Sequence, residues 1–246
     1  MNPARSRTGT VRPYEPRDRA AVRAICCKTA YRNLGARAVF EDEELFADYW
    51  CKYYTDYEPE SCLVVEEDGA VVGYLFGCVD ARRHVRLMSR RIMPPLVAKM
   101  LWRLATGRYR EPVTRRTIRY LLFRSWKEAP PVPVERFPAH YHCNLLRKAH
   151  GGRYYSTMAV IFLDRLKALG VAGLHGQVEE PTSGGAWQHM VNSYKRDDLM
   201  DYYAERPSSF HRRVRGVEKP MVNRVWGIKL ETYRMWLLWI ARDFRI

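Results

Sequence analysis

The spacing of apolar positions along the chain alternates between the two-residue period of strands and the 3.6-residue period of helices. Short apolar runs predict strands at 10–14, 62–66, 71–78, 139–146 and 173–179, and a hairpin-like pair at 210–217 and 222–230. Helical spacing predicts helices at 18–29, 42–54, 156–169, 186–194 and 231–244. This order predicts an α/β (α+β) fold with a mixed central sheet flanked by helices and an extra C-terminal helix.

Several of these elements have recognisable ends. Asp68-Gly69 between two apolar runs predicts a tight hairpin turn at 67–70. Asp18 and Ser156 are expected to cap the helices that follow them, because a short polar side chain can accept a hydrogen bond from the first free backbone N–H groups. Gly170 is expected to end the helix at 156–169.

The net charge of +15 is concentrated in one segment. Residues 82–127 contain fourteen Lys and Arg residues against one acidic residue, Glu111. Proline near the start of each apolar stretch predicts two helices there, at 94–105 and 112–126, followed by a stiff Pro-rich linker. We therefore expect one domain at 10–246, preceded by a flexible basic tail at 1–9. A basic helical insertion, 81–136, separates the N- and C-terminal halves of its sheet.

Composition excludes several classes of protein. The six cysteines form no C-x-x-C pair and show no zinc-ligand spacing, so we expect no metal site. No secretory leader is recognisable, which favours reduced thiols and a cytoplasmic location. The longest apolar run, 235–241, is seven residues, whereas a transmembrane helix needs about 20. Peripheral association with a membrane stays open.

Two stretches resemble a known superfamily. Val11-Arg-Pro-Tyr14 and the hairpin 61–74 look like the opening strands of many bacterial GNAT acyltransferases. Pro138-Ala-His-Tyr-His-Cys-Asn-Leu-Leu146, with 162–175 after it, resembles a bacterial subgroup of the same superfamily. The resemblance covers roughly residues 10–80 and 137–195. It implies a GNAT-like sheet and transfer of an acyl group from a thioester to an amine.

The resemblance also identifies a divergent donor loop. GNAT members hold the donor diphosphate on backbone N–H groups of a Q/R-x-x-G-x-G/A loop at a helix N-terminus. The aligned residues here are His150-Gly151-Gly152-Arg153-Tyr154-Tyr155, so Arg153 and Tyr155 occupy the glycine places. With Lys148 and Ser156, these residues are the candidate binding site for acyl-CoA or acetyl-CoA. A backbone N–H near Leu145 or Leu146 is expected to polarise the donor carbonyl.

Three interpretations of that loop remain open. In the first interpretation, the side chains of Arg153 and Lys148 contact phosphate in place of the lost backbone amides, and the donor is an acyl-CoA. Alternatively, the diphosphate is absent, and the donor is an acyl-phosphopantetheine on a carrier protein. In the third interpretation the chain binds no donor and is a catalytically inactive GNAT-like binding module.

Three side chains are candidates for the chemistry. His140 and His142 alternate with Asn144 on one face of a strand, and His140 lies where some GNAT members present a Glu base. A pair of buried structural histidines is the competing interpretation. Tyr194 lies one turn beyond the place of the thiol-protonating tyrosine in the family and could substitute for it; a core tyrosine is the alternative.

The basic segment 82–127 indicates an anionic partner. Its cationic residues are interleaved with Trp102, Trp126 and large aliphatic side chains, which suits an anionic membrane surface or an acidic carrier protein. Nucleic acid ranks below these partners, because the neighbouring residues are aliphatic rather than polar. The insertion could instead cover the acyl pocket. The apolar stripe of the C-terminal helix fits either a membrane contact or docking onto the core.

Overall fold

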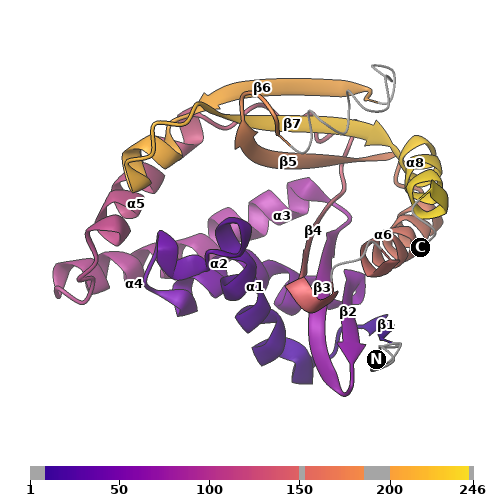
Figure 1. Ribbon diagram of the computed structural model, residues 1–246, viewed down its shortest axis with the longest axis horizontal. Coiled ribbons are helices and arrows are strands. Elements are labelled where there is room, and N and C mark those ends of the chain that lie inside the picture. The colour runs from indigo at the N-terminus through magenta and orange to yellow at the C-terminus, as the bar shows by residue number, and fades with distance from the viewer. Residues whose placement is uncertain (1–8, 150–152, 186–199, 244–246) are drawn as a thin grey trace, which may run out of the picture.

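The computed structural model describes residues 9–149, 153–185 and 200–243, with the side chains of 239–243 excepted. Its strands form two sheets (Figure 1). In the first, β1 (Thr10–Pro13), β2 (Cys62–Glu67), β3 (Ala70–Cys78) and β4 (His140–Leu145) pair antiparallel in that order. In the second, β7 (Met221–Lys229) lies between β5 (Gly173–Pro181) and β6 (Tyr202–Ser208), again with antiparallel pairing.

The two sheets meet through one short parallel contact. Ala139, just before β4, bridges to Leu174 of β5. The Ala139 N–H donates to the Gly173 carbonyl at 3.4 Å, and the Ala139 carbonyl accepts from the His175 N–H at 2.8 Å. Beyond this point β4 pairs only with β3 and β5 only with β7. The strands therefore diverge, and the predicted mixed α/β architecture is confirmed.

Helices cover both faces of the first sheet (Figure 1). On one face α1 (Arg19–Asn33) and α2 (Glu43–Tyr57) pack through Val22, Ile25 and Tyr54 onto Tyr74 and Phe76 of β3. On the other face α6 (Arg153–Ala168) and α8 (Leu230–Asp243) lie side by side. The buried residues of this second core include Met158, Phe162, Leu163, Tyr233 and Leu237.

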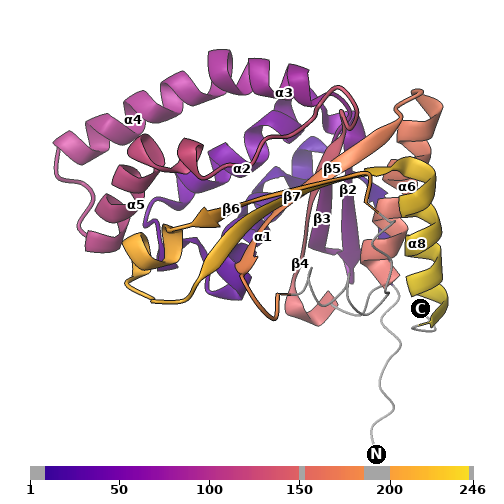
Figure 2. The same cartoon turned by 90° about the horizontal axis from the view of Figure 1, so that it is seen from above.

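The helical insertion lies between β3 and β4. Residues Ala81–Leu87 (α3), a π-helical turn at Met88–Ile92 and Met93–Ala105 (α4) follow one another without leaving helical backbone angles. Figure 2 shows α3 and α4 running end to end along one edge of the molecule. Helix α5 (Pro112–Phe123) follows after a short loop. Asp80 caps this helical run by accepting from the N–H groups of Arg82 and Arg83.

Several expected boundaries need correction. The first inserted helix is longer than expected, because helical backbone begins at Ala81 and continues through the π-helical turn into α4. Ser156 does not cap α6, which begins three residues earlier, at Arg153. The segment 210–217 is not a strand: it contains a π-helical turn, His211–Arg215, and β6 lies upstream at Tyr202–Ser208.

Other expectations can be compared directly. The hairpin turn is confirmed, with φ of 50° at Asp68 and 74° at Gly69. Gly170, with φ of 69°, follows the end of α6 as expected. All six cysteines carry free thiols. The stripe of α8 docks onto the core through Tyr233 and Leu237. The expected tail residues 1–8 and the helix at 186–194 lie outside the described residues. In the described part of the chain, no helix combines the length and the apolar character that crossing a bilayer requires.

Candidate active site

The opening between β4 and β5 leaves β4, the last strand of the first sheet, accessible. Every side chain of β4 from His140 to Leu145 is partly exposed, whereas Val72–Cys78 on the neighbouring β3 is fully buried. On β5, Leu174 and His175 are buried beside the bridge, but Gly176 to Glu179 are at least partly exposed. The exposure thus begins where the two strands separate.

The backbone of β4 presents donors to this opening. Successive N–H groups of a strand point to opposite edges. The Ala139 N–H points to β5, and the Leu146 N–H donates to the Val72 carbonyl on β3 at 2.9 Å. By this alternation the N–H groups of Tyr141 and Cys143 are directed toward the β5 side. Of the two residues expected to polarise a donor carbonyl, Leu146 has its N–H engaged with β3.

His140 and His142 lie on the face of β4 that α1 and α2 cover. The Nε2 atom of His140 lies 3.0 Å from the Tyr54 hydroxyl. The Nε2 atom of His142 lies 3.2 Å from the side-chain amide nitrogen of Asn144, which also donates to the Tyr74 hydroxyl at 2.8 Å. In both imidazoles Nδ1 is buried and has no hydrogen-bond partner among the described residues.

Both imidazoles are neutral near pH 7. Burial lowers the pKa of His142 to about 4. Burial lowers the pKa of His140 well below its usual range, and the nearby imidazoles of His175, His84 and His142 lower it further. A neutral imidazole has a lone pair and can accept a proton, but the lowered pKa makes each ring a weak base, so it can hold the proton only briefly before passing it on.

Two further histidines complete the cluster. His84 of α3 lies 5.0 Å from His140, and His175 of β5 lies 5.1 Å from it, measured between ring centroids. His175 is oriented by a 2.6 Å hydrogen bond from Nδ1 to the Phe137 carbonyl. Sequence reasoning missed both residues. Nothing local in the sequence points to His84, because its turn is held near β4 by a long-range hydrogen bond from the Ala81 N–H to the Pro138 carbonyl at 2.7 Å. No group in the described part of the chain has an arrangement that could hold a metal ion.

Aromatic side chains from α2 border the histidine face. The Trp50 ring lies 5.2 Å from His142, and Tyr49 meets Trp50 edge to face at 5.2 Å. Both side chains are exposed, Tyr49 by 45% and Trp50 by 40%, so they line an accessible surface rather than a core. This border is the apolar part of the candidate acceptor side.

Adjacent carboxylates on β5 have different surroundings. Glu180 is buried and paired with Arg224 of β7, which makes it part of the core. Glu179 is partly exposed, accepts a hydrogen bond from Ser208, and lies 3.4 Å from His211. Glu179 is thus the carboxylate that a bound molecule could reach.

A cluster of tyrosines occupies the opposite face of β4. The hydroxyl of Tyr141 lies 2.6 Å from that of Tyr155 and is also hydrogen-bonded to that of Tyr233. The hydroxyls of Tyr155 and Tyr233 are 3.0 Å apart. Tyr155, one of the two residues at a glycine place of the donor loop, therefore directs its side chain into the space between α6, α8 and the sheet.

The remaining candidates for donor binding lie around the N-terminus of α6. Lys148 and Arg153 are exposed and make no ion pair among the described residues. The Tyr154 hydroxyl accepts from the Gly9 N–H at 2.9 Å, and Ser156 is buried within α6. His150, Gly151 and Gly152 lie outside the described residues, as does Tyr194. Leu145 and Leu146 are partly buried at the end of β4.

Comparison with known proteins finds similarity at the level of the whole chain. No family model matches. The crystal structure of SsHAT is 27% identical, with a TM-score of 0.56, over 91% of this chain and 98% of that chain. An N-acetyltransferase from Staphylococcus aureus Mu50 is 12% identical, with a TM-score of 0.48, over 91% and 99% of the two chains. The yncA structure from Salmonella typhimurium, which contains acetyl-CoA, is 13% identical, with a TM-score of 0.46, over 90% and 94%.

Proposed function

The chain belongs to the GNAT superfamily, and we propose that it is an N-acyltransferase that moves an acyl group from an acyl thioester to an amine. The observation that carries this proposal is the opening between β4 and β5. It has backbone N–H groups directed into it and two neutral imidazoles on one face. A thioester placed in the opening can be polarised by the N–H groups while an amine approaches from the histidine face.

The hydrogen bonds support different roles for the two imidazoles. The Asn144 amide donates to His142 Nε2, so the hydrogen of neutral His142 is on Nδ1. His140 can instead donate from Nε2 to the Tyr54 oxygen, which places its lone pair on Nδ1; that atom is buried here, so the side chains around it must shift before an amine or a water can reach it. In our proposal His140 takes the amine proton, directly or through one water, as the C–N bond forms and the C–S bond breaks. His142 orients the acceptor. Tyr194 remains the candidate that returns a proton to the thiolate.

A thiol-release assay with acetyl-CoA and longer acyl-CoA donors against a panel of amines tests the activity. We expect His140→Ala to lower kcat/KM by about 10²- to 10⁴-fold, the usual contribution of a positioned base. Cys143→Ala is the matched control, because it keeps the strand and the backbone N–H. Equal activity of wild type and His140→Ala would remove the proposed base.

Donor recognition is the finer part of the proposal. We propose that Arg153 and Lys148 contact donor phosphate, since both are exposed cations beside the positive end of α6, where an anion is favoured. Arg153→Ala/Lys148→Ala should then raise KM for acyl-CoA at least tenfold. It should leave KM unchanged for a short N-acetylcysteamine thioester, which has no phosphate. An equal change for both donors would argue against phosphate contacts.

The same assays also test the two alternative interpretations, in which the donor is an acyl carrier protein or the chain is catalytically inactive. Activity with an acyl carrier protein but not with acyl-CoA would assign the donor to the carrier. No binding of any thioester, and no CoA found in the purified protein by mass spectrometry, would leave a non-catalytic GNAT-like module. In both the active and the non-catalytic interpretation, we propose that the basic helical insertion at 81–136 is a surface for an anionic carrier protein or membrane.

A further inference from the structure

The outer face of α4, the C-terminal part of the α3–α4 helix, carries a row of exposed apolar side chains. Trp102 is 62% exposed and Leu101 42%, and Pro94 and Ala98 precede them at helical spacing and are also exposed. Val85 of α3 is 60% exposed but is separated from this row by the arginines at 86, 90 and 91. Isolated exposed apolar residues are common on protein surfaces, but a row along one helix marks an interaction site.

This exposure is not the result of a loosely placed helix. The inner face of the same helix is buried, with Ile92 and Met100 in the core and Arg103 paired to Asp42 and Glu44 of the α2 N-terminus. The outer row is therefore held rigidly in place and has no partner within the described chain.

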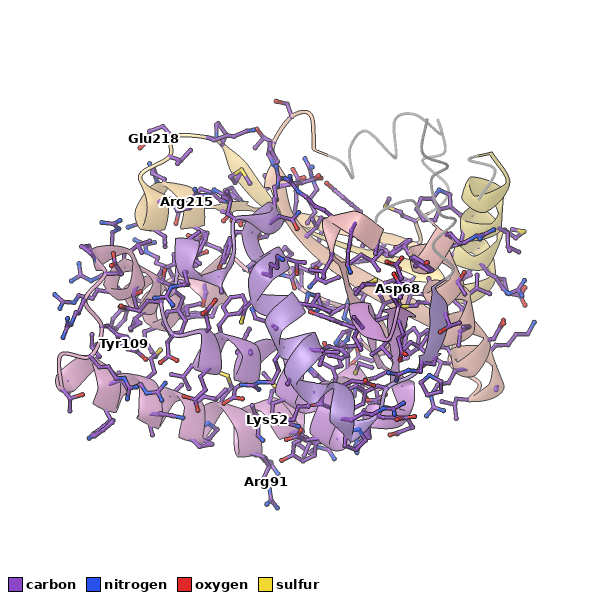
Figure 3. The ribbon with its side chains drawn as sticks, turned by 60° about the horizontal axis from the view of Figure 1, so that its bottom comes forward. Lys52, Asp68, Arg91, Tyr109, Arg215 and Glu218 are labelled. Carbon is purple, nitrogen blue, oxygen red and sulfur yellow. The ribbon has the colours of Figure 1, made fainter. Side chains whose placement is uncertain are left out.

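The charges that border the row are of one sign. Arg86, Arg90 and Arg91 are exposed and make no ion pair with any described residue. Figure 3 shows Arg91 projecting away from the rest of the molecule. Arg108 and Arg110 are exposed just beyond the other end of α4. No acidic residue occurs between Ala81 and Arg110.

We infer that the outer face of α3–α4 binds an anionic lipid membrane, with the helix lying flat on the surface. Twenty-five helical residues give a rod of roughly 37 Å, with arginines at both ends and apolar side chains between them. In that orientation the arginines reach lipid headgroups while Leu101 and Trp102 enter the boundary below them. Tryptophan is also favoured at this boundary.

The other anionic partners fit this face less completely. Nucleic acid would satisfy the arginines but would offer no apolar surface to Leu101 and Val85. An acidic carrier protein would likewise pair with the arginines, but it would offer less apolar surface to Leu101 and Trp102 than a lipid boundary does. The next helix repeats the same combination, because Phe123 and Trp126 are each 65% exposed near α5 among exposed cations.

The test is co-sedimentation of the full chain with vesicles of phosphatidylcholine alone or mixed with phosphatidylglycerol. We expect binding to the anionic vesicles that weakens with added salt, and little binding to neutral vesicles. Arg90→Gln/Arg91→Gln should lower the partition coefficient roughly 30-fold, from about 1 kcal/mol for each basic residue at the surface. Leu101→Gln/Trp102→Gln should lower it about tenfold or more, since the apolar contribution is lost.

Matched controls come from exposed residues elsewhere. Lys28→Gln/Arg37→Gln removes two exposed charges, and Leu34→Gln/Leu169→Gln removes two exposed leucines; neither should change partitioning. Thermal unfolding verifies that every variant is folded. The inference is overturned by equal binding to both vesicle types, by no binding to either, or by binding that survives both α3–α4 variants. Binding to acyl carrier protein or nucleic acid without binding to vesicles would also overturn it.

Discussion

Replacing Arg103 tests how firmly the insertion is joined to the rest of the fold. Its side chain is 8% exposed, and its Nη1 lies 2.5 Å from Asp42 Oδ2 while Nη2 lies 2.7 Å from Glu44. Asp42 is the N-cap of α2, where it accepts from the Leu45 N–H at 3.2 Å, and it also accepts from the Tyr109 hydroxyl at 2.9 Å. Arg103→Met keeps the length of the side chain but leaves this buried carboxylate without its cation.

The size of the effect follows from the two carboxylates. Removing one member of a buried ion pair costs about 3–5 kcal/mol, because the other charge remains in a poorly solvated place. Asp42 is also 8% exposed, but it retains two hydrogen bonds, so the lower end of about 3 kcal/mol applies. Glu44 is 52% exposed and adds little. For a domain of this size, about 3 kcal/mol corresponds to a fall in Tm of roughly 6–12 °C.

Thermal unfolding followed by circular dichroism at pH 7 measures this change. Lys99→Met is the control, since it removes only the pair between Lys99 and exposed Glu44 and should lower Tm by less than about 3 °C. If Arg103→Met melts at the wild-type temperature, the insertion is not held through this ion pair and the reasoning fails.

The same variant has a pH signature. Hydrogen bonds from Lys99 and Arg103 lower the pKa of Glu44 to about 2, from an ordinary 4.5. A carboxylate whose pKa is lowered by folding stabilises the protein fully above its unfolded pKa, and this contribution disappears as the pH falls toward the folded pKa. Glu44 is half exposed and keeps Lys99 in the variant, so only the small part of the Tm difference that comes from Glu44 should disappear between about pH 4.5 and pH 2.

Three further changes test other parts of the structure. Gly77→Ala should lower the free energy of unfolding in urea by about 1–3 kcal/mol, because an added Cβ would lie 2.2 Å from the Phe162 ring. Glu180→Gln should lower it by about 3 kcal/mol, since Arg224 is buried and would lose its closest carboxylate. In an NMR titration His142 should stay neutral from pH 8 to pH 5 and protonate near its pKa of about 4. Because burial lowers that pKa, its contribution to stability is present above about pH 6.5 and falls as the pH drops toward 4.

The sequence predicts best those elements whose local residues are compatible with only one secondary structure. The hairpin of β2 and β3 has two apolar runs and an Asp-Gly turn in which both residues adopt positive φ. The donor-loop helix has a clear apolar period, and only its start is three residues earlier than expected. Ser156 resembles a cap in the sequence, but it is the fourth residue of the helix, after Arg153 and two tyrosines.

Elements that depend on a partner were harder to predict. The β6 sequence from Tyr202 to Ser208 contains Glu205, Arg206 and Pro207 and has no apolar alternation, so nothing local indicates a strand. It forms by pairing along the edge of β7. His84 was missed for a related reason. It lies in the basic insertion, whose sequence indicates an anionic partner rather than a catalytic site, and its contact with His140 exists only in the folded chain.

The position of the Tyr155 side chain is compatible with the proposed donor site. A glycine in such a loop provides space for phosphate to approach the backbone, and a side chain there obstructs only if it points toward that approach. The Tyr155 hydroxyl instead bonds to Tyr141 and Tyr233, on the side of α6 that faces the sheet. The ring is thereby held in the layer between α6, α8 and β4. Arg153, at the other glycine place, is exposed at the positive end of the helix, where an anion would neutralise it. Both residues are therefore compatible with the proposal that side chains, rather than the backbone, contact the phosphate of the donor.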